Sequence, residues 1–309
     1  MQKWGKDARG KQRFRCKNCC KTAQKNRFDV TLKSRQKLFS KWLLGKFSLI
    51  ELAQKHNVTR QTLNTWFQPF WDEEPIPQIQ NIAGQVLIID GKYIEKDAVV
   101  LVGTTYKKVV SWHFSQRENF SSWTTFLSSF KHIPFAIVCD GQKGMLKAIR
   151  QIFPRVIIQR CQFHVIKYCL TKLTKNPEYE AAWEFRELVL QVSQIKTREQ
   201  LKVWLADYKY WYQTHKDFLK EKTYYHDQLT PTGRRKWSYT HGKLHAAYSH
   251  LKNSIPNLFC YLDHPQIPNT TNFVEGGINS PMQEKLRFHR GLNLPKRRIL
   301  IAHFLSSKQ

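Results

Sequence analysis

The stretch Val86-Leu87-Ile88-Ile89-Asp90-Gly91 decides the fold class, because it places a carboxylate directly after four apolar residues. A short apolar run beside a glycine is typical of a strand that is buried on both faces of a sheet. A second run of the same form, residues 135–139, ends at Asp140-Gly141. Outward from these two runs, the patterns indicate strands at 98–105, 108–114 and 156–161 and helices at 118–130 and 144–153. We therefore expect an α/β fold with a mixed sheet and helices packed on it.

Asp90 and Asp140 are expected at the ends of neighbouring strands. A carboxylate there is costly to ionise, and two of them repel each other unless they share a proton or a cation. Mg²⁺ and Mn²⁺ prefer such hard oxygen ligands. The alternative is that each Asp only begins a tight turn, where Asp-Gly is common. The repetition of the same arrangement favours a paired site.

Glu275 is the candidate for a third ligand. It lies in Asn272-Phe273-Val274-Glu275-Gly276-Gly277-Ile278-Asn279, near the start of an expected helix. Considered alone, it could be a first-turn glutamate that the helix dipole favours.

Residues from about 166 to 268 have a helical pattern, with Leu201, Trp204, Leu205 and Tyr208 at helical spacing. We interpret this segment as a helical insertion in the catalytic domain. Trp237 is expected in a basic helical stretch within it, where it either packs in a core or stacks on an unpaired base.

The amino-terminal quarter is strongly basic. Residues 1–71 hold 17 Lys and Arg against three acids, within a chain of net charge +28. Charge on this scale indicates a polyanionic partner, and nucleic acid is the leading candidate. A basic protein that is merely soluble, or one that binds a membrane surface, is the alternative.

A helix–turn–helix is expected at residues 31–72. Ser34 is the predicted cap of a first helix, a second helix begins near Ser48 and ends at His56-Asn57, and Thr59 caps a third. The third helix would project four candidate DNA-binding residues, as major-groove entry requires: Arg60, Gln61, Thr62 and Asn64. An ordinary three-helix module is the alternative. Pro75 and Pro77 mark the boundary before a catalytic domain at 80–309.

Cys16 and Cys19 have the spacing of half a zinc site, within a ribbon-like segment at residues 1–30. Two thiolates cannot complete a tetrahedral site, so we expect no stable structural zinc in this chain as it stands. Seven cysteines without a dense framework, and the lack of an apolar leader, favour a reducing, cytoplasmic setting. No apolar run reaches the length of a membrane span.

The combination of motifs resembles the DDE transposases of bacterial insertion sequences that are related to eukaryotic Mutator elements. The matching strings are Ile89-Asp90-Gly91, Cys139-Asp140-Gly141 and the segment around Glu275 quoted above, together with Arg160-Cys161-Gln162-Phe163-His164 and His289-Arg290-Gly291. The strings occur in the family's order and cover nearly the whole chain.

The resemblance implies a ribonuclease-H-like core in which Asp90, Asp140 and Glu275 bind two Mg²⁺ or Mn²⁺ ions. It implies cleavage at the ends of an insertion sequence and transfer of the strand to target DNA. Cys161 and His164 would support the site, pack, or contact DNA, rather than bind a metal themselves. His289 and Arg290 would contact phosphate or lie on a solvated basic helix.

The partners implied are double-stranded DNA, both the terminal inverted repeats and the target, and further copies of the chain in a dimer or larger assembly. The setting implied is the nucleoid of a bacterium. Two alternatives stay open: another ribonuclease-H-like nuclease, and a DNA-binding regulator or inactive remnant derived from a transposase.

Overall fold

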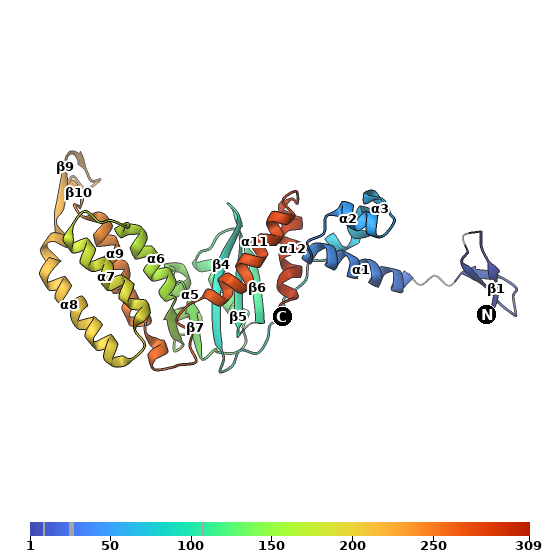
Figure 1. Ribbon diagram of the computed structural model, residues 1–309, viewed down its shortest axis with the longest axis horizontal. Helices are drawn as coiled ribbons and strands as arrows, with labels where there is room; N and C mark the ends of the chain where they lie inside the picture. Colours follow the sequence, from blue (N-terminus) through green and yellow to red (C-terminus); the bar gives the residue numbers. More distant parts are fainter. Residues whose placement is uncertain (9, 25–27, 107) are drawn as a thin grey trace. The chain divides into compact units, whose positions relative to one another are not determined.

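The computed structural model describes residues 1–8, 10–24, 28–106 and 108–309 (Figure 1). The chain forms two compact units. Unit 1 consists of Met1–Pro75 and Lys285–Phe304, and unit 2 consists of Ile76–Glu284 and Leu305–Gln309. Pro75 is the last residue of the first segment of unit 1, and the chain returns to unit 1 after Glu284.

A five-stranded mixed sheet organises unit 2, as the sequence predicts, in the order β6-β5-β4-β7-β8. Its strands are β4 (Val86–Glu95), β5 (Ala98–Thr105), β6 (Lys108–Ser115), β7 (Ala136–Cys139) and β8 (Ile157–Arg160). The first three form an antiparallel meander, and β7 and β8 run parallel to β4. The short β7 is buried along its whole length, which explains its uninterrupted apolar sequence.

Helices α4 (Phe120–Ser128) and α5 (Lys143–Ile152) pack on one face of this sheet. Asn119 caps α4 by accepting a hydrogen bond from the backbone N–H of Ser122. The core between the helices and the sheet includes Trp123, Phe126 and Met145, all almost fully buried. This packing fixes the two loops that follow β6 and β7.

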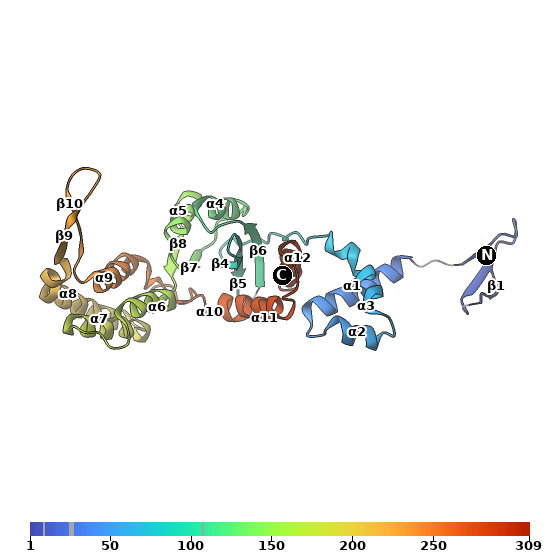
Figure 2. The same cartoon turned by 90° about the horizontal axis from the view of Figure 1, so that it is seen from above.

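A helical part follows β8 (Figure 2). It contains α6 (Gln162–Leu173), α7 (Glu180–Gln191), η2 (Val192–Gln194), α8 (Arg198–Lys220), α9 (Gly242–Ser254), η3 (Ile255–Asn257) and η4 (Cys260–Leu262). These helices share an aromatic core of their own, in which the tilted rings of Phe185 and Trp211 have centres 4.4 Å apart.

The expectation of helix around Trp237 was wrong. Residue 237 lies in a β-hairpin, β9 (Lys222–Leu229) with β10 (Arg235–Tyr239), that projects from the helical part. Pro231 and Gly233 form the turn, with Gly233 at φ +76°. These two turn-forming residues interrupt any helix, and the β-branched and aromatic residues on either side favour strands.

The chain then enters α10 (Asn272–Val274), the π-helical turn η5 (Glu275–Asn279) and α11 (Ser280–Phe288) without a break. A π-turn inserts an extra residue into the helix, and such turns occur frequently at functional sites. Thr271 precedes this run and is fully buried.

Unit 1 contains α1 (Phe28–Leu44), α2 (Leu49–Lys55), α3 (Arg60–Phe67), η1 (Gln68–Trp71) and all but the last two residues of α12 (Leu294–Ser306). The caps at Ser48 and Thr59 and the helix end at His56 agree with the sequence prediction. The first helix differs, because Ser34 lies inside α1 instead of capping it. An aromatic cluster around Phe39, Trp42 and Phe67 forms the core of this unit.

The first residues form a small antiparallel sheet of β1 (Gln2–Lys6), β2 (Gln12–Arg15) and β3 (Thr22–Gln24). Cys16 and Cys19 lie in the turn between β2 and β3. Hydrogen bonds from the backbone of Cys19 and Asn18 lower the pKa of the Cys16 thiol. Residues 25–27, at the end of the ribbon-like segment expected at 1–30, lie outside the described residues. Among the described residues, no helix is both long and apolar enough to cross a membrane.

Candidate active site

Asp90 on β4 and Asp140 directly after β7 lie at neighbouring positions of two adjacent strands. The parallel register of β4 and β7 pairs Ile88 with Val138, and each Asp stands two residues further along its chain. Their proximity explains why the charge of Asp140 raises the pKa of Asp90. The backbone register therefore places the two predicted carboxylates at neighbouring positions.

The expected environment of Asp90 needs one correction. Asp90 does not end its strand, because β4 continues to Glu95 and Asp90 pairs with Val102 of β5. The apolar run stops at Asp90 because the strand becomes half-exposed there, while its ladder with β5 continues. The alternative that Asp90 begins a tight turn is thereby excluded.

Asp140 does begin a turn. Its Oδ1 accepts a hydrogen bond of 2.9 Å from the backbone N–H of Gln142, and Gly141 has φ +83°. The Arg160 guanidinium covers Gly141 so closely that a methyl group there would lie 2.1 Å from Arg160 Nε. Gly141 is thus required both by its backbone conformation and by this contact.

Asn279 holds the Asp90 side chain from the helical run. Its Nδ2 donates a 2.6 Å hydrogen bond to Asp90 Oδ2, and the backbone N–H of Gly91 donates to Asp90 Oδ1. Burial, followed by the charge of Asp140, raises the pKa of Asp90 to about 6, against the opposing effects of His164 and Asn279. The carboxylate is thus oriented, but its charge is not fully compensated.

Glu118 is a fourth acidic residue that the sequence analysis missed. Its carboxyl group lies over Gly91, where a methyl group would be 2.7 Å from Glu118 Cδ, and it accepts a hydrogen bond from Trp123 Nε1. Burial and the charges of Asp140 and Asp90 raise the pKa of Glu118 to about 7. The glycine after Asp90 was the available signal, because a strand glycine often marks the close approach of another group.

Glu275 reaches the same region from η5. Its Oε1 accepts a 3.1 Å hydrogen bond from Thr271 Oγ1 and lies 3.6 Å from His164 Nε2. One turn later on the same helical run, Asn279 binds Asp90. The structure therefore brings all three predicted acids into one neighbourhood.

Cys161 and His164 lie directly beside Glu275. The backbone N–H and the hydroxyl of Thr271 both lie 3.3 Å from Cys161 Sγ. Burial opposes ionisation of the Cys161 thiol, but hydrogen bonds from His164 and Thr271 outweigh it and lower its pKa. The hydrogen bond to Cys161 raises the pKa of His164 to about 9, and Glu275 and Asp90 contribute.

Two sets of atoms in this region could hold a metal ion. The acids Asp90, Asp140 and Glu118 offer oxygen atoms, and the charge of Asp140 raises the pKa values of Asp90 and Glu118, an effect that a divalent cation would relieve. Asn279 Oδ1 is also buried without a hydrogen-bond partner among the described residues. Separately, ligand atoms of Cys161, His164 and Glu275 lie within 4.8 Å of one another. The carboxylate oxygens of the acids, including Glu275, fit Mg²⁺ or Mn²⁺, whereas the thiol of Cys161 and the imidazole of His164 do not.

The four candidate DNA-binding residues of α3 differ in exposure. Arg60, Gln61 and Asn64 are exposed on the helix. Thr62 is half-buried, and its backbone N–H and hydroxyl are both hydrogen-bonded to Thr59 Oγ1. Thr62 therefore belongs to the helix cap, while its three neighbours are free to face a ligand.

His289 and Arg290 do not form the expected exposed pair. His289 is 7% exposed, its Nε2 lies 3.1 Å from Leu43 O, and its ring packs edge-on against Trp42. Burial lowers the pKa of His289, so it serves as a packed neutral residue of unit 1. The expectation of a phosphate contact was wrong for His289, while Arg290 is exposed.

Trp237 remains accessible on its hairpin. Its side chain is 41% exposed, and Lys222 Nζ lies 4.0 Å from the centre of its ring. Core packing, one of the two expected roles, does not apply. The predicted stacking on an unpaired base stays a prediction.

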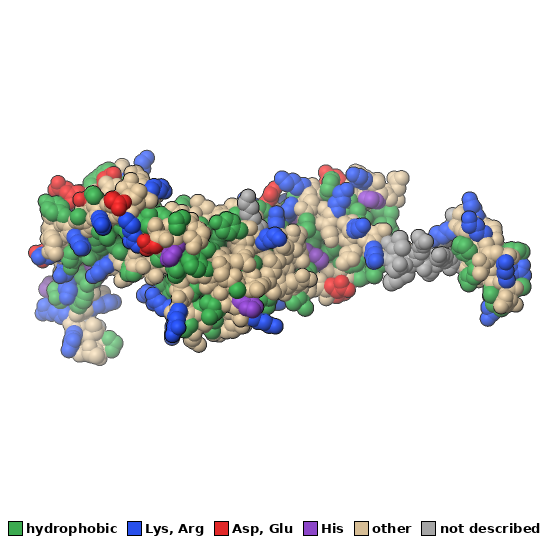
Figure 3. All heavy atoms as spheres, turned by 90° about the horizontal axis from the view of Figure 1, so that it is seen from below, with side chains coloured by type: hydrophobic (Ala, Val, Ile, Leu, Met, Phe, Trp, Pro, Cys, Tyr) green, Lys and Arg blue, Asp and Glu red, His purple; other side chains and the backbone are tan. Residues whose placement is uncertain are grey.

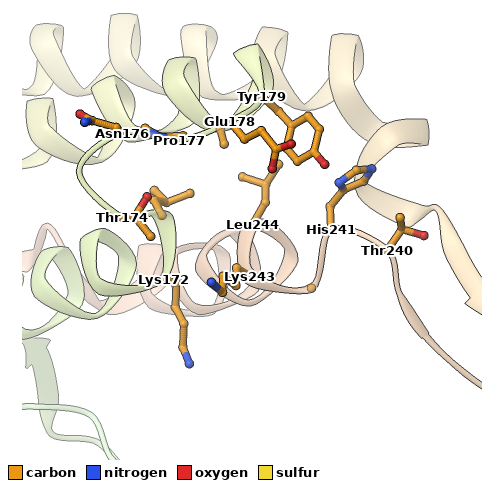
Figure 4. Close-up of a pocket in the computed structure, with 13 residues that line it drawn as sticks. Lys172, Thr174, Asn176, Pro177, Glu178, Tyr179, Thr240, His241, Lys243 and Leu244 are labelled. Carbon is orange, nitrogen blue, oxygen red and sulfur yellow. The ribbon is translucent and has the colours of Figure 1, made fainter.

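The helical part also contains cavities. One of about 440 Å³ lies where the segment between α6 and α7 meets the start of α9. Figure 4 shows Tyr179 beside His241 in this cavity, and their ring centres are 4.9 Å apart. Its lining includes none of Asp90, Glu118, Asp140 and Glu275.

Positive side chains are spread over the surface of each unit. On the face drawn in Figure 3, Lys and Arg side chains occur throughout both units, whereas Asp and Glu side chains are sparse. This distribution agrees with the net charge of +28 and suits a polyanionic ligand.

Comparisons with known proteins match the central part of the chain. Residues 92–231 match the family described as "Transposase, Mutator family". The chain is 25% identical over 125 residues to the transposase for insertion sequence element IS256 in transposon Tn4001 of Staphylococcus aureus, which covers 37% of this chain and 31% of that protein. It is 29% identical over 106 residues to the transposase for IS6120 of Mycolicibacterium smegmatis, covering 33% of each chain.

A third relative, the transposase for IS905 of Lactococcus lactis subsp. lactis, is 24% identical over 139 residues, which is 40% of this chain and 36% of that protein. The aligned part of the chain thus spans about a third of the length of these curated relatives. Asp140 and Glu118 lie inside the family match, and Asp90 and Glu275 lie outside it. The comparisons support a relationship between this chain and a family of transposases.

Proposed function

We propose that the chain is a DDE-type transposase that binds the ends of an insertion sequence and catalyses metal-dependent DNA cleavage and strand transfer. The observation that carries the proposal is the convergence of Asp90, Asp140 and Glu275 from two adjacent strands and one helical run. The similarity of the chain to transposases supports DNA cleavage and strand transfer as the reaction of this acidic centre. The relation to eukaryotic Mutator elements belongs to the same proposal.

The proposed core is ribonuclease-H-like. The antiparallel meander followed by two parallel strands, with α4 and α5 on one face, supports this assignment. Asp90 lies on β4, the middle strand of the sheet, and Asp140 follows the adjacent parallel strand β7. The helical part between β8 and α10 is then the insertion that separates the second Asp from Glu275.

The protein's own residues provide orientation and charge. Asp90, Asp140 and Glu275 would hold two Mg²⁺ or Mn²⁺ ions, which when bound activate a water or a 3′ hydroxyl and stabilise the leaving oxygen. Asn279 orients Asp90, and Thr271 and His164 orient Glu275. This arrangement suits a reaction in which the enzyme mainly positions an in-line phosphoryl transfer.

DNA would be held by the basic surface and by α3. Exposed Arg60, Gln61 and Asn64 suit contacts with base edges, and exposed Arg290 suits a phosphate. Because two ends of an element must be held together, we include a homodimer or larger assembly on DNA in the proposal. Structural zinc at Cys16 and Cys19 is not part of it.

The test is a strand-transfer assay with oligonucleotides that carry the terminal sequences of the chain's own element, in Mn²⁺. Asp140→Ala should lower activity by on the order of 100-fold or more, because a metal ligand is lost. Asp207→Ala, which removes an exposed acid on α8, is the matched control and should retain activity. Equal activity in Asp140→Ala and wild type would refute the mechanism. DNA binding without any cleavage by wild type would favour a regulator.

A further inference from the structure

A second cavity of unit 2 opens beside Asp140. It has a volume of about 450 Å³ and is lined from α6 and α9 as well as from the turn after β7. This volume is within the usual range of small-ligand sites, ~300–1,000 Å³. Its lining includes three positively charged side chains and two aromatic rings: Arg160, Lys167, Lys172, Tyr168 and His250.

One residue that lines this cavity, Arg160, carries an unpaired donor. Arg160 is 5% exposed, and its buried Nε has no hydrogen-bond partner within the part of the chain that the structure describes. Its Nη2 is 3.5 Å from Asp140 O, at the limit of a hydrogen bond. A buried donor of a charged group is costly to leave unpaired, so it points to an anionic ligand.

Two lysines extend the positive charge to the rim. Lys167 is exposed and Lys172 is half-buried on α6. In Figure 4, the side chain of Lys172 points away from the other labelled residues of the neighbouring cavity, and the same residue lines the cavity beside Asp140. The only acid among the lining residues is Asp140 itself. Next to a centre that cleaves phosphodiesters, this charge suits a neighbouring phosphate.

An aromatic platform completes the cavity. Tyr168 is 40% exposed and stacks on His250, with ring centres 4.1 Å apart. Burial lowers the pKa of His250 to about 4, so the ring is neutral at pH 7. Aromatic faces among cations stack with unpaired bases, whereas the bases of a duplex present only their edges.

We propose that this cavity is a subsite for one unpaired nucleotide of the DNA strand that flanks the scissile phosphate. Its phosphate binds Arg160, Lys167 and Lys172, and its base stacks on Tyr168. The inference rests on the proposed function, because it takes the acids as the place of cleavage. It adds that the DNA strand is unpaired beside Asp140.

The test measures anisotropy of fluorescein-labelled oligo(dT) and of an abasic strand of equal length, with the full chain, in EDTA. Tyr168→Ala should weaken oligo(dT) binding by about 5- to 100-fold, the effect of losing one stacked base. It should leave the abasic strand unchanged. Tyr210→Ala, which removes a 75% exposed tyrosine of α8, is the control and should change neither.

A second binding experiment tests the contacts between the lysines and the phosphate. Lys167→Ala/Lys172→Ala should reduce the slope of log affinity against log salt by up to about 0.7, the contribution of one single-strand phosphate contact. Lys202→Ala/Lys209→Ala removes the same charge from exposed positions of α8 and should leave the slope unchanged. Thermal melting of each variant confirms that it is folded.

The proposed subsite would be overturned if both lysine pairs reduced the salt slope equally. It would also be overturned if Tyr168→Ala weakened binding of oligo(dT) and of the abasic strand equally. The binding assay needs no metal and no cleavage, so it is independent of the strand-transfer assay. If strand transfer depends on Asp140 but the expected binding differences are not found, only the subsite proposal is refuted. The binding pattern without strand transfer would remove the proposed reaction and leave a single-strand binding site.

Discussion

At the residue scale, Glu118 and Asp90 have raised pKa values because they are partly buried close to other acids. Among the described residues, Asp90 is bonded to the amide of Asn279 and its charge is only partly offset by His164, while Glu118 is bonded to the indole of Trp123. The repulsion is therefore stored in the folded, metal-free protein. A protonated carboxyl or a bound cation would release it.

Glu118→Gln should stabilise the metal-free protein at pH 8 but not at pH 4. The folded-state pKa of Glu118, about 7, lies above its ordinary value of 4.5. The stability that the protonated group contributes is therefore complete below pH 4.5 and lost as the pH rises through 7. Glutamine keeps the acceptor for Trp123 Nε1 and removes the charge. Melting curves in EDTA at both pH values check this, and an equal shift at both would contradict it.

The hydroxyl of Thr271 should contribute to both stability and activity. It is fully buried and donates to Glu275 Oε1, and it lies 3.3 Å from Cys161 Sγ. Thr271→Val keeps the shape but leaves these groups without the hydroxyl, which should cost about 1–3 kcal/mol of unfolding free energy. It should also reduce strand transfer, because Glu275 loses its orientation.

Thr271→Ser is the matched control, since it retains the hydroxyl. Urea denaturation and the strand-transfer assay are the measurements for both variants. If valine is tolerated as well as serine in both measurements, Thr271 does not position Glu275.

At the element scale, the sequence predicted those strands and helix ends that are marked by residues within or beside the element itself. The five strands, the caps at Ser48 and Thr59 and the helix at Glu275 follow from apolar runs and capping residues. The length of β4 did not follow, because the ladder with β5 continues through residues that are not apolar. The hairpin β9–β10 was missed because the aromatic and basic residues of its strands were interpreted as helical.

The sequence could predict those site residues that follow a recognisable buried strand. Asp90 and Asp140 follow buried runs, but Glu118 belongs to the site through its approach to Gly91 from the loop between β6 and α4. The burial of His289 depends on Leu43, which is 246 residues away along the chain. No local pattern contains such contacts, so these roles require the folded structure.

The packing of α4 against α5 should depend on Gly144. A methyl group there would lie 2.9 Å from the backbone N of Phe120, which cannot move without shifting α4. Gly144→Ala should therefore cost about 1–3 kcal/mol of unfolding free energy. Gly242→Ala at the start of α9 meets nothing within 4 Å and should be neutral or slightly stabilising. Equal melting temperatures for the two variants would contradict the packing described.

At the scale of the whole molecule, the net charge of +28 should dominate DNA affinity. Binding to a random duplex should weaken by about 10³-fold or more between 50 and 200 mM salt, if some six or more phosphates are contacted. Filter binding over this range is the measurement. An affinity that is insensitive to salt would exclude the phosphate backbone as the main ligand.

The central claim is that Asp90 and Asp140 together form a divalent cation site. The most direct measurement is titration of the full chain with Mn²⁺, followed by electron paramagnetic resonance of the free ion. Asp90→Asn/Asp140→Asn should weaken Mn²⁺ binding by on the order of 100-fold or more, because two oxygen ligands become neutral amides. Asp207→Asn/Asp217→Asn, a pair of exposed acids on α8, should bind Mn²⁺ as wild type does. Wild-type affinity in the Asp90/Asp140 double variant would contradict the account.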